Sequence, residues 1–91
     1  MKKLNYNYLE RLVRGFANHR RIEILNLLER HPELSVEEMA KILNANVKTI
    51  SAHIIRLAIA GLILKKHSTN AIRHKLSTKG KSILMFLRTL D

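Results

Sequence analysis

Residues 35–61 read SVEEMAKILNANVKTISAHIIRLAIAG, and this stretch predicts two helices joined by a short turn. Ser35 followed by Glu38 is a capping box, in which the hydroxyl accepts from an early backbone N–H of the helix and the carboxylate accepts from the N–H of the capping residue. Apolar residues then recur at helical spacing. The pattern stops at residues 44–46, Asn-Ala-Asn, where asparagine both tolerates left-handed backbone and caps helices, so a second helix is expected to begin near Val47.

The second helix of this stretch has one apolar side and one polar side. At about 100° per residue, Ile50, Ile54 and Leu57 fall within one narrow arc, whereas the opposite arc is short-chained and basic. A short helix, a turn and a second helix with such an outward face form a helix-turn-helix, in which the second helix enters the DNA major groove by its N-terminal residues. The outward residues are Lys48, Thr49, Ala52 and Arg56.

The distribution of charge favours a polyanionic partner. The net charge is +10, from 17 Lys and Arg against seven Asp and Glu. Residues 1–38 hold seven basic and six acidic residues, whereas residues 39–90 hold ten basic residues and no acid. A field of one sign repels itself and is normally retained because it meets a polyanion, although a surface that only improves solubility would carry the same sign.

Composition excludes several other classes of protein. A chain of 91 residues with 46% apolar content suits one domain, residues 1–91, with a largely aliphatic core. The absence of Cys excludes disulfides and thiolate metal sites. No run approaches the roughly 20 apolar residues of a membrane span, and no cleavable signal follows the Met-Lys-Lys start, so we expect a cytoplasmic, nucleoid-associated protein and no membrane partner. Isolated His residues, with no partnering nucleophile and no glycine-rich phosphate loop, give no basis for an enzyme or a cofactor.

The rest of the chain completes a definite order of elements. Apolar spacing predicts a first helix over residues 6–17 and a second over residues 19–30, which Asn18 caps and Pro32 ends. After the helix-turn-helix, two short extended runs flank the turn-forming residues 67–70 and predict a hairpin. The expected fold is mainly α (α+β), in the order α-α-α-α-β-β-α, with a helix-turn-helix at 35–61, a two-stranded antiparallel wing at 62–77 and a C-terminal helix at 78–90 that is capped by Ser77 or Thr78.

This order is that of a winged helix-turn-helix, and parts of the sequence resemble the ArsR-type repressors. The run FANHRRIEIL (16–25) is similar to the start of the family's second helix. The family's helix-turn-helix is similar to the runs LSVEEMA (34–40), VKTISAHI (47–54) and LAIAGLI (57–63). The ending HKLSTKGK (74–81) is closer to MarR-like and archaeal winged-helix regulators. The resemblance covers residues 16–90 and implies a dimeric transcription regulator.

The resemblance also implies roles for individual residues. Lys48, Thr49 and Ser51 fall on positions where the family reads bases, and His53 falls on a position near the DNA backbone. Lysine favours guanine O6 and N7, and threonine can donate, accept or touch a thymine methyl. We therefore expect base contacts from Lys48, Thr49, Ser51 and Ala52. Simpler interpretations are a solvated helix face for the first two, a hydrogen bond to its own helix for Ser51 and a packed imidazole for His53.

Other basic residues are expected to contact phosphates. Arg56 lies two turns beyond Lys48, farther from the bases. The hairpin carries basic side chains together with His67 and His74, which suits a wing that lies along the phosphates or dips into the minor groove, although charge on an edge strand also prevents aggregation. The predicted phosphate contacts are His53, Arg56, Lys65, Lys66, Arg73 and Lys75.

Two apolar surfaces need a partner. The first and last helices carry broad stripes that we expect to form a homodimer interface: Leu9, Leu12, Phe16, Ile83, Phe86, Leu87 and Leu90. Ile55 and Ile59 lie on the outward arc of the second motif helix, where the ArsR pattern has polar residues. They contact the wing or a neighbouring subunit, or the assumed phase of the helix is wrong.

No metal site is expected, because ArsR-type metal sensors use Cys in the first motif helix or Asp and His pairs on the last helix, and this sequence has neither.

We therefore predict a sequence-specific regulator that binds double-stranded DNA as a homodimer and represses by occupying its operator. No small-molecule effector is evident from the sequence. Two alternatives remain: a winged-helix module for protein contacts, with Ile55 and Ile59 on the partner surface, and a protein that binds RNA or binds DNA without specificity, as chromatin proteins do. The salt dependence of binding distinguishes the first alternative from binding to DNA. A comparison of specific duplex, random duplex and single-stranded RNA distinguishes the second alternative from sequence-specific binding of double-stranded DNA.

Overall fold

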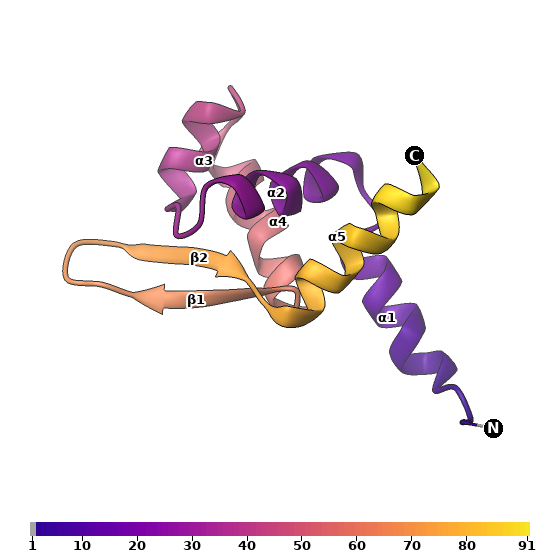
Figure 1. Ribbon diagram of the computed structural model, residues 1–91. Coiled ribbons are helices and arrows are strands. Elements are labelled where there is room, and N and C mark those ends of the chain that lie inside the picture. The colour runs from indigo at the N-terminus through magenta and orange to yellow at the C-terminus, as the bar shows by residue number, and fades with distance from the viewer. Residues whose placement is uncertain (1) are drawn as a thin grey trace.

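The computed structural model describes residues 2–91, and its elements follow the predicted order (Figure 1). The mainly α fold with a two-stranded antiparallel wing is confirmed. The elements are α1 (Tyr6–Phe16), α2 (His19–Arg30), α3 (Val36–Ile42), α4 (Val47–Ile59), β1 (Ile63–His67), β2 (Ile72–Leu76) and α5 (Thr78–Leu90). Within residues 2–91, no helix has the length and apolar character that spanning a bilayer requires.

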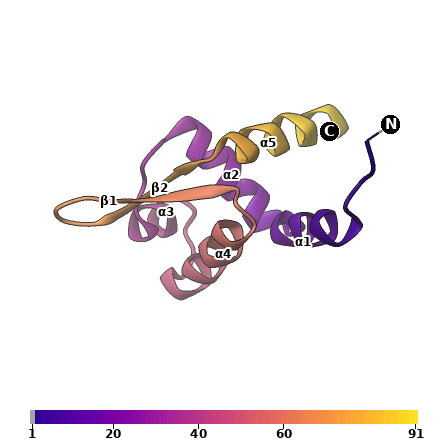
Figure 2. The same cartoon turned by 90° about the horizontal axis from the view of Figure 1, so that it is seen from below.

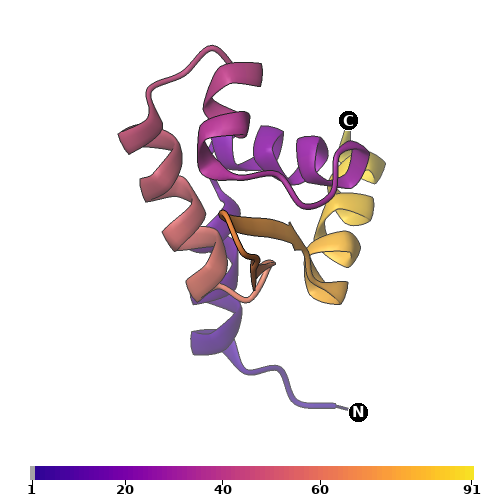
Figure 3. The same ribbon diagram turned by 90° about the vertical axis from the view of Figure 1, so that its left-hand side faces the viewer.

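The wing projects from one side of the molecule, and α1 and α5 lie on the opposite side (Figure 1). Seen from below, α4 and α5 lie on opposite sides of the sheet (Figure 2). The helix α3 packs against α4, α1 packs against α4, and α5 packs against α2. When the wing points toward the viewer, α4 runs along the outer edge of the molecule (Figure 3). One long side of α4 is therefore not covered by the rest of the fold.

Side-chain caps set the starts of the helices. The Ser35 hydroxyl accepts from Glu38 N at 3.1 Å, and Glu38 Oε1 accepts from Ser35 N at 2.8 Å, so the predicted capping box is present. The Asn18 side chain caps α2, as predicted. Of the two residues considered for α5, Ser77 is the cap, and its hydroxyl also donates to Gly61 O at 2.6 Å. This bond ties the start of α5 to the end of α4.

Two residues with left-handed backbone bound α4, the second helix of the helix-turn-helix. Asn44, in the turn before it, has a φ of 51°, and Gly61, which follows the C-cap residue Ala60, has a φ of 76°. Glycine adopts this conformation without a steric cost, and asparagine does so more readily than other residues with a side chain. The turn and the end of the helix therefore lie where the sequence predicted them.

The core is aliphatic, and its residues confirm the prediction of which side of α4 faces inward. Ile50, Ile54 and Leu57 are all buried, and they pack with apolar residues of α2, α3 and β1. Leu12 and Phe16, which we predicted for a dimer interface, belong to this core and are only 9% and 8% exposed. Little of either side chain remains for a second subunit, so this part of the prediction is revised. An amphipathic stripe has the same spacing whether it covers the protein's own core or a partner.

His74 is a core residue, whereas the sequence placed it with the basic surface of the wing. The residue is 2% exposed, and its ring Nδ1 lies 3.1 Å from Leu34 O. The backbone of His74 also pairs with the segment before α3, because His74 N donates to Leu34 O at 2.9 Å and Glu33 N donates to His74 O at 2.9 Å. Burial lowers the pKa of His74. The wing is thus anchored to the helix-turn-helix through a neutral imidazole.

This lowered pKa predicts a loss of stability in acid. The unfolded chain takes up a proton on His74 below about pH 6.5, whereas the folded protein resists protonation, so the unfolded state binds more protons there. The free energy of unfolding should therefore fall as the pH falls below about 6.5, with no effect of His74 above that range. In urea unfolding at about pH 7.5 and about pH 5.5, His74→Gln should lose less stability than the native chain. Equal losses in both proteins would contradict this role.

Candidate nucleic-acid interface

The first turn of α4 is exposed, as a base-reading helix requires. Lys48, Thr49 and Ala52 are all exposed. The Asn46 side-chain oxygen accepts from Lys48 N at 2.7 Å and from Thr49 N at 3.4 Å. This cap fixes the backbone of the turn and leaves the two side chains accessible. Ser51, the remaining predicted base contact, is partly buried on the side of α4 that faces the wing.

Removal of the cap should loosen this turn. Asn46→Ala leaves Lys48 N and Thr49 N without their acceptor, and the loss of an asparagine cap typically costs about 1 kcal/mol of unfolding free energy. Asn46→Ser retains an oxygen acceptor and should keep most of that stability. Urea unfolding of the two variants beside the native chain provides the measurement. Equal stability of the alanine and serine variants would show that the cap does not set the start of α4.

His53 is partly buried and is engaged by an arginine within the fold. Arg21 Nε donates to His53 Nδ1 at 3.2 Å, and Arg21 Nη1 donates to Arg14 O at 3.0 Å and to Gly15 O at 3.2 Å. Burial and then the charge of Arg21 lower the pKa of His53, which favours the neutral ring that accepts this bond. The predicted phosphate contact of His53 is therefore revised to a contact that joins α1, α2 and α4. Sequence reasoning did not single out Arg21, because its partner is 32 residues away.

The basic residues of the wing divide into two pairs. Lys66 Nζ lies 3.3 Å from Glu33 Oε1. Arg73 Nη1 donates to Glu33 O at 2.9 Å and to Glu38 Oε1 at 3.1 Å. Arg73 therefore ties the wing to the start of α3, and its predicted phosphate contact is revised accordingly. The other pair is exposed, and within residues 2–91 its side chains make no hydrogen bond or ion pair: Lys65 and Lys75.

The two outward isoleucines border separate pockets, which supports the predicted phase. Ile55 is 50% exposed and borders a pocket of about 420 Å³ between α4 and the wing, together with Ser51 and Lys65. Ile59 is 76% exposed and borders a second pocket, between α4 and α1. Ile55 therefore faces the wing, which is one of the places that the sequence allowed for it. Ile59 has no such cover.

The two histidines of the hairpin are not directly opposite each other. In the strand register His67 is opposite Ile72, and His74 is opposite Lys65. In the part of the chain that the structure describes, no three His, Cys, Asp or Glu side chains are grouped so that they could hold a metal ion.

A helix-turn-helix whose second helix has an open basic first turn, followed by a basic wing, defines a winged helix-turn-helix regulator. The family model described as bacterial regulatory protein, ArsR family, matches residues 18–65, which is more than half of the chain. The chain therefore belongs to the ArsR family of bacterial regulatory proteins. It is a helix-turn-helix transcription regulator and not an enzyme.

Solved structures of other regulators are similar to this chain. Reduced HlyU from Vibrio cholerae N16961 is 30% identical with a TM-score of 0.80, over 94% of this chain and 90% of that one. The transcriptional regulator HlyU from Vibrio vulnificus CMCP6 is 29% identical with a TM-score of 0.75, over the same shares. Mb0332 from Mycobacterium bovis, a homodimeric winged helix-turn-helix DNA-binding domain, shares the fold with a TM-score of 0.81 at 24% identity, over 99% and 88%. A comparison with curated proteins found no match.

Proposed function

We propose that this regulator binds a specific double-stranded DNA sequence as a homodimer and represses transcription by occupying its operator in the cytoplasm. The observation that carries the proposal is the exposed first turn of α4, where Lys48 and Thr49 can reach base edges in the major groove. Ala52 continues this face, and Ser51 borders it on the side of the wing. These four residues are the proposed base contacts.

The phosphate contacts proposed here are the basic residues that the fold leaves accessible. Lys65 and Lys75 on the wing and Arg56 on α4 are exposed. Lys66 is also exposed, and its contact with Glu33 is a surface ion pair of the kind that contributes little and can be exchanged for a phosphate. Contacts of this kind position α4 on the duplex without reading its sequence.

The homodimer is proposed to form through α1 and α5, which both lie on the side of the molecule opposite the wing (Figure 1). Phe86 is 53% exposed and Leu90 is 67% exposed, so α5 presents large apolar side chains to solvent. Exposed apolar area of this kind is typical of protein interfaces. The homodimeric state of the structurally similar Mb0332 supports the same assembly. The remaining proposed interface residues are only partly exposed: Leu9, Ile83 and Leu87.

The role of the wing is tested by a double variant. Lys65→Ala/Lys75→Ala should weaken binding to every duplex by a similar factor and should flatten the plot of log affinity against log salt, by about 0.9 for each phosphate that the wing no longer neutralises. The control with the same change of charge is Arg30→Ala/Lys81→Ala, on α2 and α5, which should leave affinity and slope unchanged. Unchanged binding in the wing variant would remove the wing from the mechanism.

The same titration separates the proposal from a protein-interaction module. Association through Ile55 and Ile59 would bury apolar surface and would not weaken steeply as salt increases, whereas phosphate contacts release counterions and do. Single-stranded RNA that competes as well as a preferred duplex would favour the RNA-binding alternative.

A further inference from the structure

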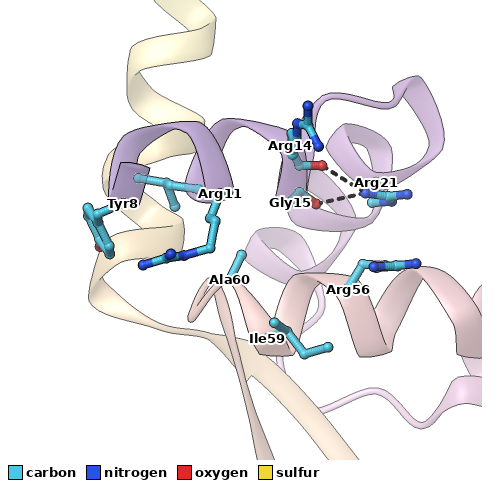
Figure 4. A pocket seen from close by; sticks show the side chains of 9 residues that line it. Tyr8, Arg11, Arg14, Gly15, Arg21, Arg56, Ile59 and Ala60 are labelled. Atoms are coloured by element: carbon cyan, nitrogen blue, oxygen red, sulfur yellow. Dashed lines mark hydrogen bonds between the residues drawn. The ribbon is translucent and has the colours of Figure 1, made fainter. Parts of the chain in front are cut away.

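A pocket of about 550 Å³ lies between α1 and the C-terminal end of α4 (Figure 4). Four arginines from three helices line it: Arg11 and Arg14 from α1, Arg21 from α2 and Arg56 from α4. Within residues 2–91, none of the side chains that line this pocket is acidic. Positive charge gathered on one concave surface produces a field that attracts anions.

Two of these arginines have no partner in the fold. Arg14 Nη2 lies 3.0 Å from Glu10 Oε2, and Arg21 donates to the backbone carbonyls at the end of α1. Arg11 and Arg56 are both exposed, and in the described part of the chain their side chains make no hydrogen bond or ion pair. Their guanidinium donors are therefore available to an anion outside the protein.

The two free guanidinium groups point to opposite ends of the pocket, and Ile59 and Ala60 lie between them (Figure 4). A single small anion is therefore a poor match for both. One strand of DNA carries a phosphate about every 3.4 Å along the helix axis, so a strand offers separate phosphates to separate arginines. The sugars between these phosphates are less polar and can lie against Ile59, which is 76% exposed. The arrangement fits a continuous sugar-phosphate backbone.

Arg56 connects this pocket to the base-reading turn of α4. It lies eight residues after Lys48, which is about 12 Å along the helix at about 1.5 Å per residue. The major groove is also about 12 Å wide, so a helix that reads bases with Lys48 brings Arg56 to the strand at the edge of the groove. Arg11 lies at the far end of the pocket from Arg56 and can meet a further phosphate.

The place of the pocket in the fold indicates which part of the DNA it would meet. In two views at right angles, the wing lies on one side of α4 and α1 lies on the other (Figures 1 and 2). Because the proposed dimer forms through α1 and α5, α1 is closer to the two-fold axis than α4, and the wing is farther from it. DNA at this pocket therefore belongs to the segment between the two half-sites.

Arg11 stays accessible in the proposed dimer. Residues two positions apart on a helix point to nearly opposite sides. Arg11 lines the pocket, whereas Leu9 and Val13 belong to the opposite apolar side of α1. The dimer surface and the pocket therefore occupy different sides of one helix.

We propose that the surface between α1 and α4 is a second contact with the DNA backbone, in which Arg56 and Arg11 bind different phosphates of the segment that joins the two half-sites. This contact would add Arg11, a residue outside the helix-turn-helix and the wing, to the DNA-binding surface. The proposal rests on the proposed function, because it requires that the protein bind duplex DNA.

The test is a salt titration of binding to a duplex of about 40 bp and mixed sequence, since phosphate contacts do not depend on sequence. Arg11→Gln should flatten the plot of log affinity against log salt by about 0.9, the value for one lost phosphate contact. The ratio of native to variant affinity should therefore fall about threefold between about 50 mM and about 200 mM salt. Arg56→Gln should behave in the same way.

Arg30→Gln, which removes one exposed arginine at the end of α2, is the matched control and should leave the slope unchanged. Arg11 has no partner to lose, so Arg11→Gln should also keep the native stability in urea. An Arg11→Gln protein with the same slope as Arg30→Gln would overturn the proposal.

Neutral linkages in the DNA test the position of the contact. In the two-fold-symmetric duplex recovered from a random pool, methylphosphonates replace the phosphates one at a time. Some linkages between the half-sites should weaken binding of the native protein but not of Arg11→Gln, whereas linkages at the outer flanks should weaken both equally. Equal losses in the two proteins at every linkage would also overturn the proposal.

The native protein separates this proposal from the proposed function. Absence of binding to any duplex would reject both. Binding with a steep salt dependence that Arg11→Gln does not alter would reject only the contact at α1. Recovery of no preferred site would count against sequence-specific binding, and the salt titration would still decide whether Arg11 binds a phosphate.

Discussion

Replacement of Lys48 by alanine is expected to weaken binding to the preferred duplex by about 1–3 kcal/mol, which is a factor of about 5–150. Lys48 is exposed in the first turn of α4, and the backbone beneath it is fixed by Asn46. A lysine in that place can bond guanine O6 and N7, so its loss removes a contact that depends on sequence. Affinity for unrelated duplexes should therefore fall much less than affinity for the preferred one.

The comparison between duplexes makes this result interpretable. Both affinities are measured at one salt concentration, because affinities for DNA depend steeply on salt. Lys81→Ala on α5 provides the control for a simple loss of positive charge. An equal loss on every sequence would make Lys48 a phosphate contact, and no loss on any duplex would remove α4 from the interface.

Gly80→Ala is expected to destabilise the fold by about 1–3 kcal/mol or more, since overpacking against backbone is difficult to relieve. A Cβ at Gly80 would lie 2.1 Å from Leu62 O and 3.3 Å from Leu76 Cδ2. The Leu62 carbonyl has little freedom to retreat because it accepts from Ser77 N at 3.0 Å. The usual effect of this substitution inside a helix is the opposite, a gain of about 1 kcal/mol.

Urea unfolding measures this prediction, and Ser82→Ala, an exposed position on the same helix, serves as the control. The control should stay close to the native stability. A Gly80→Ala protein as stable as the native chain would show that the start of α5 does not pack closely against Leu62, in the segment between α4 and β1.

The sequence predicted the elements well because their signals are local. Ser35 with Glu38, Asn46 and Gly61 each act on backbone within a few residues, so a helix start or end can be recognised without the tertiary structure. The phase of α4 also followed from spacing alone, because Ile50 and its apolar neighbours recur on a single arc.

The site was predicted less completely because its remaining contacts are long-range. His53 and Arg73 were assigned to phosphates from their charge and position, whereas their partners lie 32 to 40 residues away and hold them within the fold. The same charge pattern fits both roles. Leu12 and Phe16 show the corresponding ambiguity for apolar residues, since helical spacing does not distinguish a core from a dimer interface.

The selection of bound duplexes from a random pool tests the central claim most directly. If two copies of α4 read the major groove, the recovered site should be two-fold symmetric, with half-sites about one helical turn, or about 34–36 Å, apart. Recovery of no preferred sequence, or of a motif that Lys48→Ala and Thr49→Ala leave unchanged, would contradict reading of DNA by α4.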